Sequence, residues 1–147
     1  MRITTRGRYG LRAMIDVARH QGDGPVMMRQ ITERQRIPRK YLHSLLHQLQ
    51  QGELIRSMRG SRGGYVLTRD PADITALMII EALEGKISLV ECRKNDPGAC
   101  EMYHTCPTRE LWASLADVIG RHLEGVSLAH LAGGTPMVRS KAEKGRL

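Results

Sequence analysis

The stretch PRKYLHSLLHQLQQGELIRSMRGSRGGYVLTR, residues 38–69, decides the fold because a helix pattern is followed directly by a hairpin pattern. Pro38 suits the start of a helix, and Gly52 is well placed to end it. The leucines between them have the spacing of one helical face: Leu42, Leu45, Leu46 and Leu49. Residues 54–59 and 65–68 are short strand candidates around a glycine-rich loop, which is typical of a β-hairpin.

The residues before this stretch supply the first helix of a helix-turn-helix. Residues 28–35 have helical spacing with Ile31 turned inward, and a break at Arg36–Ile37 separates them from the next helix. Two helices joined by a short turn outline a helix-turn-helix over about 28–51. The hairpin over 54–69 then has the position of a wing, and this order of elements is more specific than either element alone.

Three more helical segments complete a mainly α fold with a small β-hairpin wing. Residues 5–20 have the spacing of an amphipathic helix. Asp73 can cap a helix that runs to about Glu84, with inward positions at Ile74, Leu77, Ile80 and Leu83. Pro107 begins the last long helix, whose broad apolar stripe consists of Leu111, Trp112, Leu115, Val118, Ile119 and Leu123.

Charge and composition limit the class of protein. Residues 1–69 hold 14 Lys and Arg against 4 Asp and Glu, which predicts a polyanion-binding module, with a solvated basic face as the alternative. The chain has only five aromatic residues, four tyrosines and one tryptophan. Proteins that bind single strands or RNA by stacking on bases usually have more, so duplex DNA is the favoured ligand.

No apolar run approaches the ~20 residues that span a bilayer, and the N-terminus has no apolar signal segment. Three cysteines without a secretion signal then favour a cytoplasmic protein without membrane contact.

The first turns of the helix after Pro38 are the predicted reading head, because a recognition helix lays its N-terminal turn in the major groove. Polar side chains there can reach phosphates and base edges: Arg39, Lys40, Tyr41, His43 and Ser44. The wing tip suits the minor groove, whose negative potential attracts guanidinium groups, and it consists of Arg59, Gly60, Ser61 and Arg62. The structural alternatives are a partly buried Tyr41, an ordinary surface His43 and solvated wing arginines.

All three cysteines lie in CRKNDPGACEMYHTC, residues 92–106, a loop-like stretch broken by Pro97 and Gly98. Four roles remain open: incidental buried thiols, structural zinc with His104 as a fourth ligand, a thiol redox switch, and an iron–sulfur cluster. Neither gap fits the C-x2–4-C pairs of structural zinc, whereas the basic neighbours of Cys92 suit a reactive thiol. Wide gaps around Pro-Gly are compatible with a loop that wraps a cluster, which makes the cluster the first expectation.

The chain resembles the IscR/NsrR/RirA/CymR family of bacterial winged-helix regulators (the Rrf-two family) from Met1 to about Leu131. The shared motifs are MRITTRGRYGLRAM at the start, GPV at 24–26, ITERQ-I at 31–37, KYL at 40–42, RGSRGGYVLTR at 59–69, and three cysteines followed by LW at 111–112. This combination is far more specific than a helix-turn-helix alone.

The resemblance implies a homodimer that binds operator DNA and senses a cluster or a metabolite. In IscR-like members, cysteines at the places of Cys92, Cys100 and Cys106 hold an iron–sulfur cluster, with 2Fe–2S as the first expectation here and 4Fe–4S as the alternative. The helix from Pro107 is similar to the family's dimerisation helix. The family's DNA contacts fall on the recognition-helix turn and on the wing.

Several positions depart from the family pattern. Arg109 stands where IscR-like members have a histidine ligand, and Arg8 stands where NsrR-like members have a ligand aspartate. The fourth ligand is therefore unassigned among His104, Glu101, Asp96 and a non-protein ligand. His43 replaces the glutamate common in IscR-like members, the gap of seven between the first two cysteines resembles RirA-like iron regulators, and CymR-like members lack these cysteines.

The sequence thus predicts a sequence-specific transcriptional regulator, not an enzyme, whose cluster senses iron–sulfur, iron or redox status. The alternative is a thiol- or metabolite-responsive member of the same family, without a cluster or with structural zinc. Neither a C-x-x-C pair nor a base–nucleophile arrangement supports a thiol oxidoreductase, and a ligand-free architectural DNA-binding protein is a further class. The expected layout is one domain over 1–132, with a winged helix-turn-helix (1–70), a linking helix (71–91), a cluster-binding loop (92–106) and a dimerisation helix (107–132), followed by a mobile basic tail (133–147).

Overall fold

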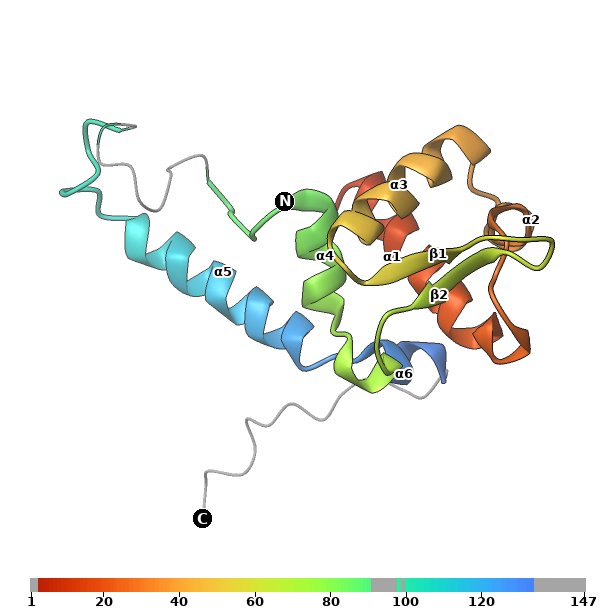
Figure 1. Cartoon of the computed structure of the whole chain (residues 1–147). Coiled ribbons are helices and arrows are strands. Elements are labelled where there is room, and N and C mark those ends of the chain that lie inside the picture. The colour runs from red at the N-terminus through yellow and green to blue at the C-terminus, as the bar shows by residue number, and fades with distance from the viewer. Residues whose placement is uncertain (1–2, 91–97, 99, 134–147) are drawn as a thin grey trace, which may run out of the picture.

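The structure is a computed structural model that describes residues 3–90, 98 and 100–133 (Figure 1). Its elements are, in chain order, α1 (Thr5–His20), η1 (Gln21–Asp23), α2 (Met28–Gln35), α3 (Arg39–Gln51), β1 (Ile55–Met58), β2 (Gly64–Leu67), η2 (Pro71–Asp73), α4 (Ala76–Glu84), α5 (Arg109–Glu124) and α6 (Leu128–Ala132). The mainly α fold with a small antiparallel hairpin is confirmed.

Helix α1 is central and packs against α2, α3, α4 and α6. It crosses α4 closely, because a Cβ on Gly10 would lie 2.0 Å from Leu83 Cδ1. The start of α1 is tied to the end of α4 by Glu84, whose Oε1 accepts hydrogen bonds from Thr4 Oγ1 at 2.7 Å and from Gly7 N at 3.0 Å. A carboxylate at a helix N-terminus also interacts favourably with the helix dipole. The two helices therefore support each other at this end.

The helix-turn-helix consists of α2 and α3, which share the core with α1. Helix α3 buries the leucines that its spacing predicts, and Ile31 of α2 and Ile37 of the turn are buried beside them. Arg36, the C-cap of α2, has the left-handed conformation with φ 53°. Pro38 is the N-cap of α3 and not its first helical residue, a difference of one position from the prediction.

The wing is a two-stranded hairpin that is docked onto the segment before α2. Ile55 pairs with Leu67 and Met58 with Gly64 in antiparallel register. Val26 adds a bridge to the outer side of β2: Val26 N donates to Tyr65 O at 2.9 Å, and Tyr65 N donates to Val26 O at 2.8 Å. The loop between the strands extends past α2 at the edge of the molecule (Figure 1).

Helix α4 begins later than predicted, at Ala76. Thr75 is its N-cap, since the Thr75 hydroxyl accepts a hydrogen bond from Met78 N at 3.2 Å. Asp73 is not the cap, because it belongs to the short 3-10 turn η2 that Asp70 caps. Of the predicted inward positions, Ile74, Ile80 and Leu83 are buried, whereas Leu77 is only half-buried.

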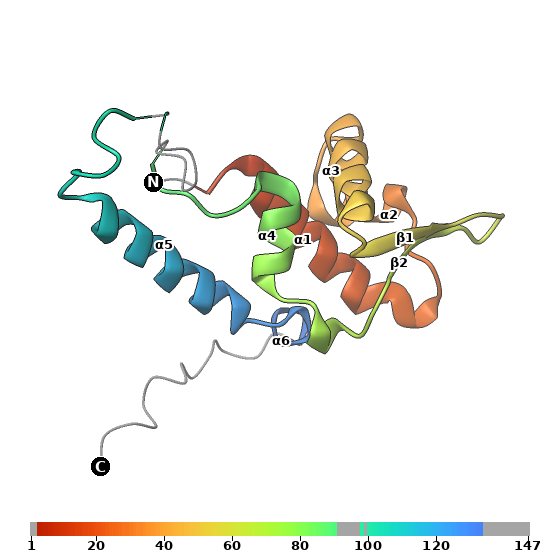
Figure 2. The same ribbon diagram turned by 60° about the vertical axis from the view of Figure 1, so that its left-hand side comes forward.

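The last long helix is divided into α5 and α6 by Gly125 and Val126. The break is held by backbone pairing with the start of α4, because Ala76 N donates to Val126 O at 2.8 Å and Leu128 N donates to Ile74 O at 2.7 Å. The predicted helix over 107–132 is therefore two helices. Figure 2 shows that α5 meets the rest of the fold near α4 and α6 and diverges toward its own N-terminus. Cys92 and the basic tail after Gly133 lie outside the described residues.

Candidate nucleic-acid interface and thiol segment

The N-terminal turns of α3 present polar side chains opposite the buried leucines. Arg39, Lys40, His43 and Ser44 are exposed on this surface. Tyr41 is half-buried, and its ring meets the Tyr9 ring of α1 edge-on with a centroid separation of 5.9 Å. The structure thus brings the four exposed candidates together and places Tyr41 partly between α3 and α1.

The wing tip is a tight, exposed turn. Gly63 N donates to Gly60 O at 3.0 Å, and Gly60 has the positive φ of 114° that this turn requires. The four predicted tip residues are all exposed: Arg59, Gly60, Ser61 and Arg62. The glycines keep this loop small, and its two arginines can enter the narrow minor groove of DNA.

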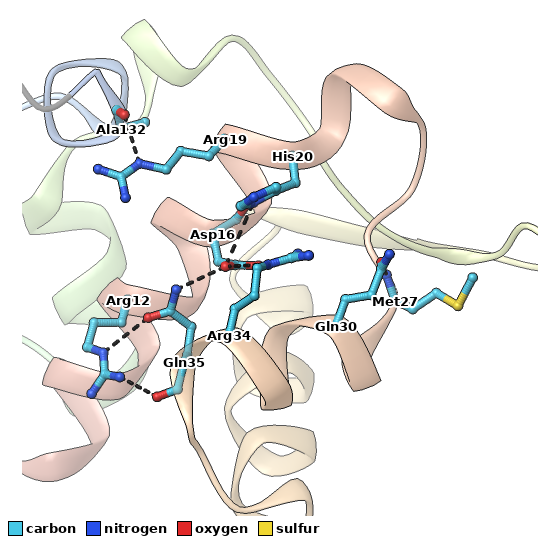
Figure 3. A network of polar contacts seen from close by, with 9 residues as sticks. All are labelled: Arg12, Asp16, Arg19, His20, Met27, Gln30, Arg34, Gln35 and Ala132. Atoms are coloured by element: carbon cyan, nitrogen blue, oxygen red, sulfur yellow. Dashed lines mark hydrogen bonds and ion pairs between the residues drawn. The ribbon is translucent and has the colours of Figure 1, made fainter.

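A buried carboxylate joins α1 to the helix-turn-helix (Figure 3). Asp16 is 1% exposed and accepts hydrogen bonds from Arg34 Nη2 at 2.8 Å, Arg34 Nε at 3.0 Å and Gln35 Nε2 at 2.9 Å. Burial by itself raises the pKa of the Asp16 carboxyl, but hydrogen bonds from Arg34 and Gln35 and the charge of Arg34 outweigh burial and hold this pKa below its usual value. Sequence analysis missed Asp16, although an acid inside the apolar run AMIDVA was a signal.

The described part of the cysteine segment forms successive turns at the start of α5. Tyr103 N donates to Cys100 O at 3.0 Å, and Thr105 N donates to Met102 O at 3.0 Å. Cys100 and Cys106 are half-buried free thiols in these turns. Figures 1 and 2 place this segment at the opposite side of the molecule from the wing.

The Cys106 thiol has neighbours that favour its ionised form. Its Sγ lies 3.4 Å from Thr108 Oγ1. Hydrogen bonds from the Thr108 side chain and backbone, with a smaller effect of the Arg109 backbone and charge, lower the pKa of Cys106. The thiolate is the form of cysteine that binds metals and reacts as a nucleophile.

Arg109 and His104 both pack against Tyr103. Arg109 Nη1 donates to Tyr103 O at 3.1 Å, its Nη2 donates to the Tyr103 hydroxyl at 2.9 Å, and its guanidinium lies 3.9 Å from the ring centroid. The exposed His104 ring meets the same ring edge-on at 5.0 Å. Within the described ranges, no group of three or more His, Cys, Asp or Glu side chains is assembled for a metal ion. The fourth ligand stays a prediction.

Helix α5 carries an exposed apolar face. Leu111 is 57% exposed, Leu115 38% and Val118 51%, and Trp112 lies beside them at 37%. Ala116 of α5 is buried, and α5 contacts α4. In the part of the chain that the structure describes, no helix is both long and apolar enough to cross a membrane.

The chain matches a known family over nearly its whole length. The family model described as Rrf2, iron-dependent transcriptional regulator, covers residues 3–134. The HTH-type transcriptional regulator IscR of Sodalis glossinidius is 39% identical over 131 residues, which are 89% of this chain and 78% of that protein. The IscR regulator of Yersinia pestis is 37% identical over 89% of this chain and 79% of its own length.

Solved structures are similar along the whole fold. CymR, the global cysteine regulator of B. subtilis, has a TM-score of 0.74 and 38% identity, covering 92% of this chain and 99% of that one. IscR of T. potens has a TM-score of 0.75 and 31% identity, covering 97% and 96%. The family and these relatives are transcriptional regulators, not enzymes. Together with the helix-turn-helix and its wing, these matches establish that the chain belongs to the Rrf2 family and is a DNA-binding transcriptional regulator.

Proposed function

We propose that the chain is a homodimeric, sequence-specific regulator whose operator affinity is controlled by an iron–sulfur cluster on Cys92, Cys100 and Cys106. The observation that carries the proposal is a pair of free thiols, Cys100 and Cys106, in turns at the start of a helix with an exposed apolar face. The iron-dependent family and the IscR relatives support a cluster. CymR, a regulator of cysteine, supports a second candidate, a thiol or metabolite response without a cluster.

The donor set in the described segment fits a cluster. Cysteine thiolates are the usual ligands of iron–sulfur clusters, and Cys106 has the surroundings that favour a thiolate. Arg109 is always a cation and cannot be a ligand. Its bonds to Tyr103 hold the turn between Cys100 and Cys106 against the start of α5. A bound cluster, 2Fe–2S or 4Fe–4S, would supply a group whose state depends on iron supply and oxidation.

A series of packed helices connects the cysteine segment (residues 100–106) with the first turns of α3, which are the proposed DNA-binding turns. Helix α5 contacts α4, and α4 packs on α1, which in turn packs on α2 and α3. A shift of α5 on cluster binding can therefore change the position of α3. A coupling of ~1–3 kcal/mol would change DNA affinity by about 5–150-fold.

Cluster binding has a direct test. Protein purified without oxygen is expected to be coloured and to contain iron and acid-labile sulfide, and Cys100→Ser and Cys106→Ser are expected to lose both. Thr105→Ala, in the same turns, is the matched control and should keep them. Colourless protein with stoichiometric zinc would contradict the cluster. Iron-free protein whose DNA affinity still depends on cysteine oxidation would favour the second candidate.

The exposed face of α5 supports a dimer formed by two copies of this helix. An apolar helical stripe of this kind is typical of a protein–protein contact. We expect wild-type protein to sediment as a dimer and Leu115→Glu to sediment as a monomer, because the carboxylate would be desolvated in the contact. Arg121→Glu places the same residue off the stripe and should remain dimeric. Monomeric wild-type protein at micromolar concentration would contradict the dimer.

The dimer sets the form of the operator. Two winged helix-turn-helix units related by twofold symmetry should bind a pseudo-palindromic site whose half-sites are about one helical turn, or a multiple of it, apart. We propose that each head contacts DNA through the α3 and wing residues named above: Arg39, Lys40, Tyr41, His43, Ser44, Arg59, Gly60, Ser61 and Arg62.

The wing arginines should contribute measurably to DNA affinity. On a duplex selected from a randomised library with wild-type protein, we expect Arg59→Ala to bind about tenfold more weakly, because a groove-inserted guanidinium is lost. Fluorescence anisotropy at fixed salt measures the change. Arg69→Ala, which removes an exposed arginine just after β2, is the control and should change affinity less than twofold. Equal affinities of Arg59→Ala and wild type would contradict the wing assignment.

A further inference from the structure

The last residue of α2 is held from outside the helix-turn-helix, at the point where the motif turns. Gln35 ends α2, and Arg36 then takes the left-handed conformation. Carbonyls at a helix C-terminus have no partner within their helix. Arg12 of α1 supplies one, because its Nη2 donates to Gln35 O, while its Nε donates to Gln35 Oε1 at 3.2 Å (Figure 3).

The other end of the Gln35 amide is fixed by the buried carboxylate. Gln35 Nε2 donates to Asp16 Oδ1 at 2.9 Å, and Asp16 pairs with Arg34. The Gln35 side chain is thus held between two residues of α1 that lie one turn apart, Arg12 and Asp16. This leaves the residue before the turn with a defined backbone and side-chain position.

The same guanidinium is also linked, through Tyr9, to the first turn of α3. Arg12 Cζ lies 5.4 Å from the Tyr9 ring centroid, within the range of a cation–π contact. Tyr9 in turn meets the Tyr41 ring edge-on at 5.9 Å. Tyr41 lies in the first turn of α3, next to the exposed Arg39 and Lys40. Arg12 therefore connects both sides of the helix-turn-helix turn.

The contacts of Arg12 add a directional restraint to the apolar packing of α3. The hydrophobic effect that buries the α3 leucines has no preferred direction. A planar guanidinium with hydrogen bonds in fixed directions defines an orientation. A few degrees of tilt at the start of α3 would move its polar side chains relative to the base edges.

We propose that Arg12 is a positioning residue for DNA recognition, which sets the angle of the first turn of α3 by holding Gln35 before the turn and, through Tyr9, Tyr41 after it. This inference rests on α3 as the recognition helix in the proposed function, and it is independent of the cluster. Because Arg12 acts through protein contacts, its loss lowers affinity for the specific site and leaves non-specific binding to phosphates unchanged.

The test compares two duplexes of equal length, one selected from a randomised library with wild-type protein and one with that sequence scrambled. Arg12→Met is expected to bind the selected duplex about tenfold more weakly, or ~1.4 kcal/mol, and to bind the scrambled duplex within about twofold of wild type. A direct phosphate contact predicts equal losses on both duplexes and a salt-dependence slope reduced by about one. Equal losses, or no loss, would overturn the proposal.

Two further variants separate positioning from charge. Arg12→Lys keeps the charge but cannot make the paired contacts with Gln35, so it should behave like Arg12→Met, whereas a phosphate contact would be rescued by lysine. Tyr9→Leu should lower specific affinity as well. The double variant Arg12→Met with Tyr9→Leu should lose less than the product of the two separate losses, since both act on Tyr41. Independent, multiplicative effects would contradict the chain of contacts.

Two controls test whether a lower affinity comes from the loss of any α1 arginine or from unfolding of the variant. Arg19→Met removes another α1 arginine that donates to a backbone carbonyl, Ala132 O at 2.9 Å, away from the helix-turn-helix, and should leave the affinity ratio unchanged. Urea unfolding shows whether each variant is folded under the binding conditions. If His43→Ala with Ser44→Ala also leaves specific affinity unchanged, α3 is not the reading helix and the proposed DNA contacts fail. If that pair lowers it and Arg12→Met does not, only the positioning role fails.

Discussion

Asp16→Ala is expected to lower the free energy of unfolding by about 3 kcal/mol, because it leaves buried hydrogen-bond donors without their acceptor. Arg34 and Gln35 together make four hydrogen bonds to the two carboxylate oxygens of Asp16. The Arg34 side chain is 32% exposed and regains some water when Asp16 is lost, which keeps the expected loss below the upper end of the range for buried pairs. Urea denaturation followed by circular dichroism at pH 7 measures the change.

Asp23→Ala is the matched control for this substitution. Asp23 is an exposed acid in η1, so its replacement should change the free energy of unfolding by less than about 0.5 kcal/mol. Similar losses of unfolding free energy for the two variants would show that Asp16 does not stabilise the fold through its buried hydrogen bonds.

The same carboxylate gives stability a defined dependence on pH. The pKa of Asp16 is lower in the folded chain than its usual value of about 3.9, so the unfolded chain takes up a proton first on acidification. The stability from the ionised group is present above about pH 4 and is lost as pH falls through the lower, folded pKa. The difference in unfolding free energy between wild type and Asp16→Asn should be constant from pH 7 to about 5 and shrink below about pH 4. A difference that grows on acidification would contradict this assignment.

Gly64→Ala is expected to detach the wing from the body and to lower the free energy of unfolding by about 2–3 kcal/mol. Gly64 has φ 154°, and a Cβ there would lie 2.6 Å from both the C and the O atoms of Val26. These are backbone atoms, so no side-chain rotation relieves the overlap. The paired hydrogen bonds between Val26 and Tyr65 would be lost with it.

Hydrogen exchange and urea unfolding together measure this effect. The Tyr65 amide should exchange much faster in Gly64→Ala, and affinity for the selected duplex should fall because the wing tip is misplaced. Gly22→Ala is the control, since a Cβ there meets nothing within 4 Å and the φ of Gly22 is ordinary. Unchanged protection of the Tyr65 amide in Gly64→Ala would show that the strand tolerates the side chain.

Elements with local signals could be predicted from the sequence. The α3 leucines repeat at helical spacing and the glycines of the wing loop lie between two short apolar runs, so both elements are encoded within about thirty residues. The start of α4 and the break after α5 could not be predicted in the same way. They depend on each other, because Ala76 and Val126 pair across fifty residues of chain.

In the candidate site, too, features that depend on local spacing could be predicted and features that depend on distant contacts could not. Exposure of Arg39, Lys40, His43 and Ser44 follows from their position opposite the leucines. The contact of Tyr41 with Tyr9 could not be predicted, since it joins α3 to a helix whose packing partners are not encoded locally. In the same way, the resemblance to IscR-like members marks Arg109 as a departure from the expected pattern, but only the folded turn reveals Tyr103 as its partner.

The pairing of Val126 and Leu128 with the start of α4 has a consequence for how such regulators diversify. The chain between Gly85, the C-cap of α4, and Gly125, the C-cap of α5, holds all three cysteines, and both of its ends adjoin α4. Residues inside this segment can therefore be exchanged while its two junctions with α4 stay the same. On the proposed function, a chimaera that exchanges residues 86–124 between homologues is expected to acquire the signal response of the donor and to keep the operator preference of the recipient.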